Sequence, residues 1–122
     1  MFPTLLQRLI PKGKDLRITV VGQHLYGVEV VTKDGQIDWR LPDIDAQYRR
    51  ITVQPSIAAA CRKILERIQL SCGAFDFAVS PDGDWFFLEV NPVGEWACLD
   101  VKLNLGICDA LIDFLYLERS KC

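Results

Sequence analysis

The chain has 122 residues, of which half are hydrophobic and a quarter are charged, as is typical of one globular domain with a hydrophobic core. A formal net charge of −2 gives no basic field and argues against a nucleic-acid partner. No apolar stretch approaches the roughly 18 residues of a membrane span, and the N-terminus lacks a signal-peptide pattern.

The cysteines have no CxxC spacing, which argues against a zinc site. Most of them fall within apolar helix or strand patterns, so we interpret them as small core side chains. A reducing, cytoplasmic setting is the simplest one for such a set. They are Cys61, Cys72, Cys98, Cys108 and Cys122.

The first part of the chain predicts strands. A short apolar run at 3–10 ends in a Pro/Gly/Lys turn at 11–15. Residues 16–22 alternate between apolar and other side chains and are rich in β-branched residues, so they predict a strand. A tight turn then leads into 24–32, which we expect to pair with that strand in antiparallel fashion.

The middle of the chain predicts a loop and a helix. From Gln36 to Tyr48 the periodicity fails, which indicates either a mobile loop or a functional one. The clearest helix follows, because Pro55 and Ser56 suit its start and apolar residues recur at helical spacing. Gly73 suits its end.

The last part predicts a hairpin and a second helix. Strands at 74–80 and 84–90 are joined by a Pro-Asp-Gly-Asp turn. Residues 105–119 form an amphipathic pattern with Ile107, Leu111, Phe114 and Leu115 directed inward. The expected order is three strands, a long loop, a helix, two strands and a helix. The fold class is therefore α+β, with helices on one face of a largely antiparallel sheet.

The predicted hairpin carries three oxygen-donor side chains, Asp76, Glu89 and Asn91. Closure of the hairpin brings Asp76 beside Glu89, and strand alternation puts Glu89 on one face with Phe87 and Asn91. Mg²⁺ takes a few carboxylate oxygens and leaves its other positions to water and phosphates, so the set predicts a magnesium site. The alternative is a pair of acids on a solvated sheet face.

This pattern, with its Glu-Val-Asn-Pro end, resembles the metal-binding end of the ATP-grasp fold, and the likeness runs over almost the whole chain. Residues 5–22 resemble the family's hinge segment and the strand after it, and 38–40 (Asp-Trp-Arg) resemble a stretch of its loop. Residues 87–96 (FLEVNPVGEW) resemble the branch that matures ribosomally made peptides, the microviridin-type or graspetide ligases.

The resemblance implies a chemistry. In ATP-grasp enzymes ATP, held with one or two Mg²⁺ ions, phosphorylates a carboxylate, and a hydroxyl or amine attacks the acyl phosphate to give an ester or amide. It implies that Asp76, Glu89 and Asn91 are the magnesium ligands. The expected partners are ATP and a peptide with acidic side chains.

The resemblance also implies nucleotide contacts. Arg8 and Leu9 fall on the hinge, whose backbone would bind adenine, although the family usually has Glu where Arg8 stands. Asp15 matches the acid that accepts from the ribose. Arg17 and Arg40 match arginines near the phosphates and the acyl phosphate, a role that suits a planar, always charged guanidinium.

Asp15, Arg17 and Arg40 each have a simpler interpretation when considered alone. Asp15 would be a turn residue, Arg17 a solvated strand residue, and Arg40 a side chain stacked on Trp39.

The resemblance predicts that 1–122 form a single partial domain, the C-terminal ATP-grasp subdomain. No part of the sequence resembles the family's N-terminal substrate domain or the first half of its nucleotide clamp. Half of a cleft leaves electrostatic contacts screened, so we expect weak Mg–ATP binding and no ligation by the chain alone. A complementary N-terminal half or self-association would complete it.

Two functions remain open. The chain is either the metal- and phosphate-binding part of an ATP-dependent carboxylate-amine/hydroxyl ligase or a truncated or degenerate, non-catalytic remnant that acts as a binding module.

Overall fold

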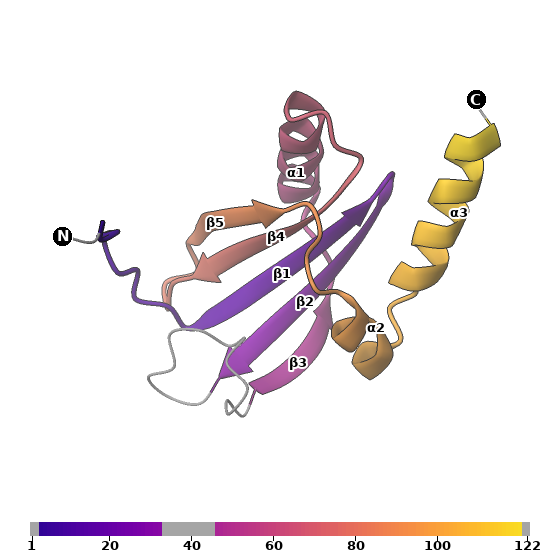
Figure 1. Cartoon of the computed structure of the whole chain (residues 1–122). Helices are drawn as coiled ribbons and strands as arrows, with labels where there is room; N and C mark the ends of the chain where they lie inside the picture. Colours follow the sequence, from indigo (N-terminus) through magenta and orange to yellow (C-terminus); the bar gives the residue numbers. More distant parts are fainter. Residues whose placement is uncertain (1–2, 33–45, 121–122) are drawn as a thin grey trace.

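The computed structural model describes residues 3–32 and 46–120, with side chains as far as residue 118. Within these ranges, five strands form one antiparallel sheet in the order β3-β2-β1-β4-β5 (Figure 1). The elements are β1 (Lys14–Val21), β2 (His24–Thr32), β3 (Ala46–Ile51), α1 (Pro55–Arg67), β4 (Cys72–Val79), β5 (Trp85–Asn91), α2 (Ala97–Leu103) and α3 (Ile107–Ser120). The predicted α+β class and antiparallel sheet are confirmed.

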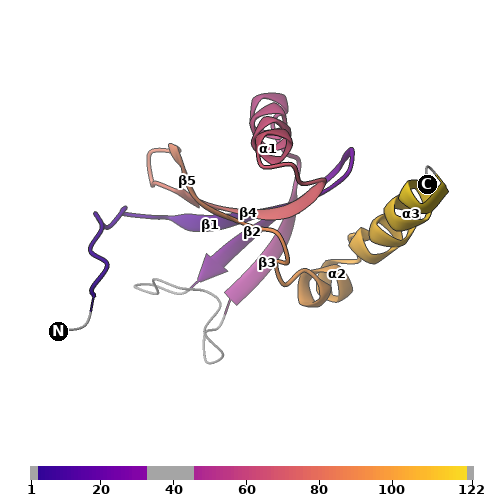
Figure 2. The same cartoon turned by 45° about the horizontal axis from the view of Figure 1, so that its top comes forward.

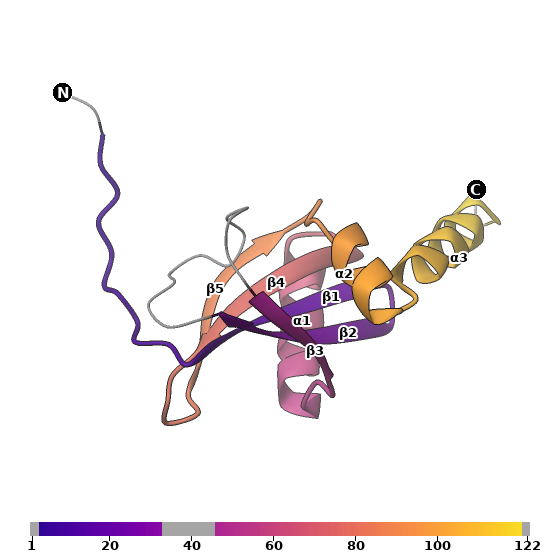
Figure 3. The ribbon, with the colours of Figure 1, turned by 90° about the horizontal axis from the view of Figure 1, so that it is seen from below.

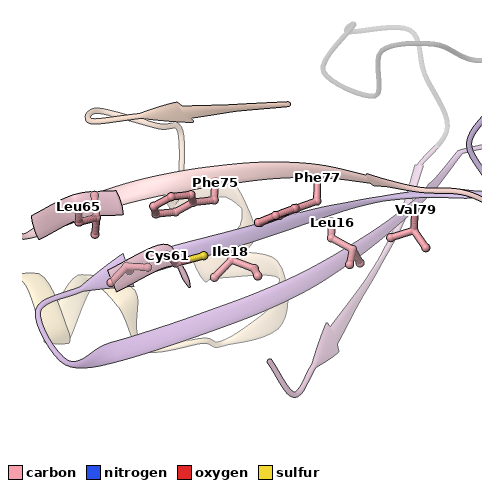
Figure 4. Close-up of a cluster of buried hydrophobic side chains, with 8 residues drawn as sticks. Leu16, Ile18, Cys61, Leu65, Phe75, Phe77 and Val79 are labelled. Atoms are coloured by element: carbon pink, nitrogen blue, oxygen red, sulfur yellow. The ribbon is translucent and has the colours of Figure 1, made fainter. Parts of the chain in front are cut away.

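The central strand β1 separates two cores, because successive side chains of a strand point to opposite faces. On one face α1 packs against the sheet, and buried side chains from β1, β4 and α1 form a single cluster (Figure 4). We call this side the α1 face. Its buried members are Leu16, Ile18, Val20, Cys61, Leu65, Phe75, Phe77 and Val79.

The opposite face carries Asp15, Arg17 and Asp76, and we call it the site face. Part of it is covered by α2 and the start of α3, where Leu99, Leu105 and Ile107 pack on valines of β1 and β2. Figure 3 shows α1 on one side of the sheet and α2 on the other, and Figure 2 shows α3 projecting beyond the sheet. The helices therefore lie on both faces, and not on the single face expected from the sequence. Polar residues of the site face therefore lie beside an apolar, helix-covered region.

Both predicted hairpins are present. Val21 pairs with His24, so the first hairpin closes through a two-residue turn in which Gly22 has a φ of +56°. The second closes through 80–84, where the hydroxyl of Ser80 accepts a hydrogen bond from the N–H of Asp84 at 3.1 Å. These turns fix the registers of β1 with β2 and of β4 with β5.

Several elements differ from the sequence prediction. The third strand, β3, follows the predicted loop, and its first residues fall inside the range assigned to that loop. α1 ends at Arg67, with Gln69 at a positive φ, so Gly73 lies in β4 and not at the helix end. α2 was not predicted. Leu115 is 65% exposed because it lies on the outer side of α3, so its predicted inward direction is wrong.

Two further expectations concern the cysteines and membrane spans. Cys61 is buried, as expected of a core side chain, whereas Cys98 and Cys108 are exposed. Within the described ranges, no helix is long and apolar enough to cross a membrane.

Candidate functional site

The site lies where three neighbouring strands meet on the site face. Arg17 of β1 pairs with Asp76 of β4, and Asp76 pairs in turn with Glu89 of β5. Asn91 lies two residues after Glu89 in β5 and pairs with Ala74. Directly paired residues in antiparallel strands are close neighbours on one face. The predicted convergence of Asp76, Glu89 and Asn91 on one side of the hairpin is therefore present.

A bulge in β5 decides which side chains share this face. The register shifts between Asp76 and Phe77, so that Asp76 pairs with Glu89 but Phe77 pairs with Phe87. Phe87 consequently points to the α1 face, where its ring centroid lies 6.3 Å from that of Phe75 and 5.9 Å from that of Phe77. The prediction that Phe87 shares a face with Glu89 is wrong, because one extra residue re-aims the strand.

Arg17 and Asp76 form a buried, bidentate ion pair. The Nε and Nη2 atoms of Arg17 donate to the two carboxylate oxygens of Asp76, each at 2.8 Å. Nη1 donates to the backbone carbonyl of Glu95 at 3.1 Å, so the same guanidinium also holds the segment that follows β5. Arg17 is 3% exposed and Asp76 is 6% exposed. The interpretation of Arg17 as a solvated strand residue is therefore wrong.

Asp15 lies two residues before Arg17 on the same face. It is buried within β1 and not in the preceding turn, and Lys12 donates to both of its carboxylate oxygens at 2.9 Å. Two buried carboxylates therefore lie on the site face, Asp15 bound by Lys12 and Asp76 bound by Arg17.

Glu89 and Asn91 are exposed at the open edge of the sheet. The side-chain oxygen of Asn91 accepts a hydrogen bond from the N–H of Val93 at 3.0 Å, which shapes the turn after β5. This hydrogen bond orients the side-chain amide of Asn91.

The donor set fits a hard divalent cation. A carboxylate has about four lone-pair positions, so one carboxylate can accept from a guanidinium and bind a cation at the same time. Carboxylate and amide oxygens are ligands that suit Mg²⁺. Within 3–32 and 46–120, no group of three His, Cys, Asp or Glu side chains is arranged to hold a metal, so the fit depends on the amide of Asn91 as third donor.

Two of the other predicted contacts, Arg8 and Leu9, are not brought to this point. Arg8 and Leu9 are exposed on a segment without regular structure that runs away from the sheet (Figure 3). Arg40, like Trp39, lies outside the described residues.

A third buried acid was missed by the sequence analysis. Glu29 is 2% exposed and accepts hydrogen bonds from Lys14 and Arg49 on the α1 face. The hydrogen bond from Lys14 lowers the pKa of Glu29; burial opposes this shift, and the hydrogen bond from Arg49 adds to it. The available signal was a glutamate flanked by valines in the middle of a strand. Glu29 faces away from Asp76, so it is not part of the site. Its ion pairs with Lys14 of β1 and Arg49 of β3 stabilise the sheet.

Neither a protein-family model nor a curated protein sequence matches the chain. Solved structures do. The macrocyclase MdnC from Microcystis aeruginosa MRC, bound with the precursor peptide MdnA, aligns at 32% identity and a TM-score of 0.75, over 89% of this chain and 34% of MdnC. A RiPP-associated ATP-grasp ligase from Chryseobacterium gregarium, in complex with ADP and a leader and core peptide, aligns at 30% identity and a TM-score of 0.78, over 89% of this chain and 34% of that ligase.

A more distant structure has the same fold. The ATP-grasp ligase PsnB, complexed with a variant of its minimal precursor, Mg and ADP, aligns at 22% identity and a TM-score of 0.68, over 86% of this chain and 34% of PsnB. The chain thus spans about a third of the length of each of these structures. It has an ATP-grasp-like fold and is similar to the ATP-grasp ligases of ribosomally made peptides.

Proposed function

We propose that the chain is the metal- and phosphate-binding part of an ATP-dependent ligase that acts on a peptide. In this reaction a peptide carboxylate is activated as an acyl phosphate and joined to a hydroxyl or an amine. The observation that carries the proposal is the meeting of Asp76, Glu89 and Asn91 on one face of an ATP-grasp-like hairpin. ATP and Mg²⁺ are the expected cosubstrate and ion, and the Chryseobacterium and PsnB structures hold ADP, the latter with Mg.

Asp76, Glu89 and Asn91 would hold the magnesium. When bound, the ion supplies charge neutralisation for the phosphoryl group that is transferred. The structure supports a division of tasks among the three side chains. Asp76 is buried and held by the two hydrogen bonds from Arg17. Glu89 and Asn91 are exposed at the open edge of the sheet, where a phosphate could reach them.

Arg17 would act on the proposed site through Asp76. Ligating carboxylates are commonly oriented by hydrogen bonds from behind, and the bidentate contact of Arg17 provides such an orientation. Contacts of Arg17 and Arg40 with the phosphates, and of Asp15 with the ribose, stay predictions. The same holds for adenine binding by the backbone of Arg8 and Leu9.

We further propose that a complementary nucleotide-binding surface completes the cleft, since the chain matches about a third of the ligases compared. That surface would come from another part of an ATP-grasp protein or from a second copy of this chain. Electrostatic contacts in a half-open site are screened by water and salt. The 122-residue chain alone should therefore bind Mg–ATP weakly and form no ester or amide.

Calorimetry tests the proposal. ATP is titrated into the chain with and without Mg²⁺, for the wild type, Glu89→Gln and the control Glu95→Gln. Both acids are exposed, and only Glu89 belongs to the proposed ligand set. We expect Mg-dependent heat in the wild type and the control and its loss in Glu89→Gln. The same absence of binding in all three forms would favour the non-catalytic binding module.

A further inference from the structure

The segment between β5 and α2 crosses the site face of the sheet. It comprises residues 92–96, and Figure 1 shows the chain running from the end of β5 across neighbouring strands to α2. Pro92, Val93 and Glu95 are exposed, so burial of their side chains does not hold the segment against the sheet. Two other contacts hold it, and both lie beside the proposed metal ligands.

The first contact is the close approach of Gly94 to β4. Gly94 is buried, and a Cβ added to it would lie 2.4 Å from the Cβ of Ala74. Carbon atoms that are not bonded to one another pack at about 3.5–4.0 Å, so a larger residue fits here only if the backbone shifts. Gly94 has no positive φ, so this position needs glycine for the close approach and not for its conformational freedom.

The second contact is the hydrogen bond from Arg17 to the next residue of the segment. Nη1 of Arg17 donates to the backbone carbonyl of Glu95 at 3.1 Å, while Nε and Nη2 hold the carboxylate of Asp76. Because the guanidinium is planar and rigid, it can make these contacts together only while segment 92–96 lies close to β4. The contact between Gly94 and Ala74 permits that short distance.

Segment 92–96 also acts on Asn91. The N–H of Val93 donates to the side-chain oxygen of Asn91 at 3.0 Å, and Asn91 pairs with Ala74, the residue on which Gly94 lies. Ala74 and Asp76 are two positions apart in β4 and share the site face. One short stretch of backbone is thus connected to two of the proposed ligands, to the amide of Asn91 directly and to the carboxylate of Asp76 through Arg17.

We propose that Gly94 is a positioning residue of the metal site, because its lack of a side chain lets segment 92–96 hold Asn91 and Asp76 in place together. The inference rests on the proposed function, since it assigns a task toward the same metal. An added methyl group would meet the methyl group of Ala74, and neither group has a side-chain torsion that could relieve the overlap. The segment would move away from β4, and its hydrogen bonds with Arg17 and Asn91 would lengthen.

Amide NMR of the 122-residue chain, titrated with Mn²⁺ in place of Mg²⁺, tests the inference. The samples are the wild type, Gly94→Ala, the double variant Gly94→Ala/Ala74→Gly and the control Gly13→Ala. The double variant removes the atom that the new methyl group would meet. A Cβ at Gly13 would lie 3.8 Å from atoms of Pro81 and Val79, so the control adds the same group without an overlap. Circular dichroism reports whether each variant is folded.

In Gly94→Ala we expect about a tenfold loss of Mn²⁺ affinity, as is typical when a contact that orients a ligand is removed. At equal occupancy, the side-chain amide of Asn91 should broaden less, relative to the backbone of Glu89, than in the wild type. The N–H of Val93 should exchange faster with water in the metal-free variant. The double variant should recover all three properties, and Gly13→Ala should match the wild type.

Unchanged Mn²⁺ affinity in Gly94→Ala, or an equal loss of broadening at Asn91 and Glu89, would overturn the inference and leave the proposed function standing. If Gly94→Ala does not fold, the double variant decides the question. Recovery of both the fold and the Mn²⁺ affinity supports the inference, and anything less overturns it. The absence of Mn²⁺ binding in the wild type would instead overturn the proposed function, and the inference with it.

Discussion

The buried pair of Arg17 and Asp76 is the residue-scale feature on which the site depends. Two charges removed from water are expensive, and here the cost is offset by two short hydrogen bonds and by a third from Arg17 to the carbonyl of Glu95. The pair also ties β1 to β4 and to the segment after β5. Its strength therefore links the stability of the sheet to the orientation of a proposed metal ligand.

Removing one member should be more damaging than removing both. Arg17→Met leaves the buried carboxylate of Asp76 without the guanidinium, and should lower the free energy of unfolding by about 3–5 kcal/mol. The double variant Arg17→Met/Asp76→Leu should recover much of that loss. Urea unfolding of the two variants and the wild type gives the values. A loss below about 1 kcal/mol for Arg17→Met would contradict the buried pair.

Glu29 predicts a pH dependence. Its folded pKa lies below its ordinary value of 4.5, mainly through the hydrogen bond from Lys14, with burial opposing and Arg49 adding to the shift. A depressed folded pKa contributes stability that is present above the unfolded pKa and is lost as the pH falls through the folded value. Glu29→Gln should therefore cost more free energy of unfolding at pH 7 than at pH 3. An equal cost at both pH values would show that the charge of Glu29 is not what stabilises the sheet.

At the scale of elements, α3 depends on a carboxylate from α2. Asp100 accepts from the N–H groups of Gly106, Ile107 and Cys108 at 2.7, 3.0 and 2.9 Å. These groups begin α3 and have no partner within the helix itself. Burial by itself would raise the pKa of Asp100, but these backbone hydrogen bonds outweigh it and hold the pKa below its ordinary value.

Loss of this cap should loosen α3. Asp100→Ala should cost about 1–2 kcal/mol and increase hydrogen exchange in α3. Asp109→Ala, which removes a first-turn acid of the same helix, should cost less than about 1 kcal/mol. Exchange measured by mass spectrometry separates the two, and equal protection of α3 in both variants would argue against the cap.

Local patterns in the sequence predicted those elements that bury an apolar stripe by themselves. β1, β2, α1 and the β4–β5 hairpin follow from periodicity and turn residues, and the hairpin was sufficient to predict that Asp76 and Glu89 are neighbours. α2 is short and held by the burial of Leu99, and β3 is polar and held by pairing with β2, so neither has a strong local signal.

Parts of the site depend on contacts between distant segments. The pair of Arg17 and Asp76 joins residues that are 59 positions apart, through a pairing of β1 with β4 that no turn specifies. The bulge that turns Phe87 away from Glu89 is likewise a property of the assembled sheet. The positions of Arg8 and Leu9 show the same dependence, since their segment is exposed and has no regular structure.

On the scale of the whole molecule, the sheet has an apolar, open edge at β5. Phe86, Phe87 and Leu88 are 39%, 49% and 46% exposed, and an edge strand offers unpaired backbone groups to another strand. We expect concentration-dependent association, which a lysine at position 88 (Leu88→Lys) should reduce. Light scattering over a range of concentrations measures this, and a monomer at every concentration would contradict it.

The measurement that tests the central claim most directly is a titration with Mn²⁺, a paramagnetic substitute for Mg²⁺, followed by amide NMR. The proposed metal site predicts that the signals of Asp76, Glu89 and Asn91 broaden first and that Glu89→Gln weakens this effect. The acidic residues Glu66 of α1 and Asp113 and Glu118 of α3 are an internal comparison within the same chain. Broadening centred on these three residues, or spread evenly over all acidic residues, would contradict the assignment of the β4–β5 end as the metal- and phosphate-binding site.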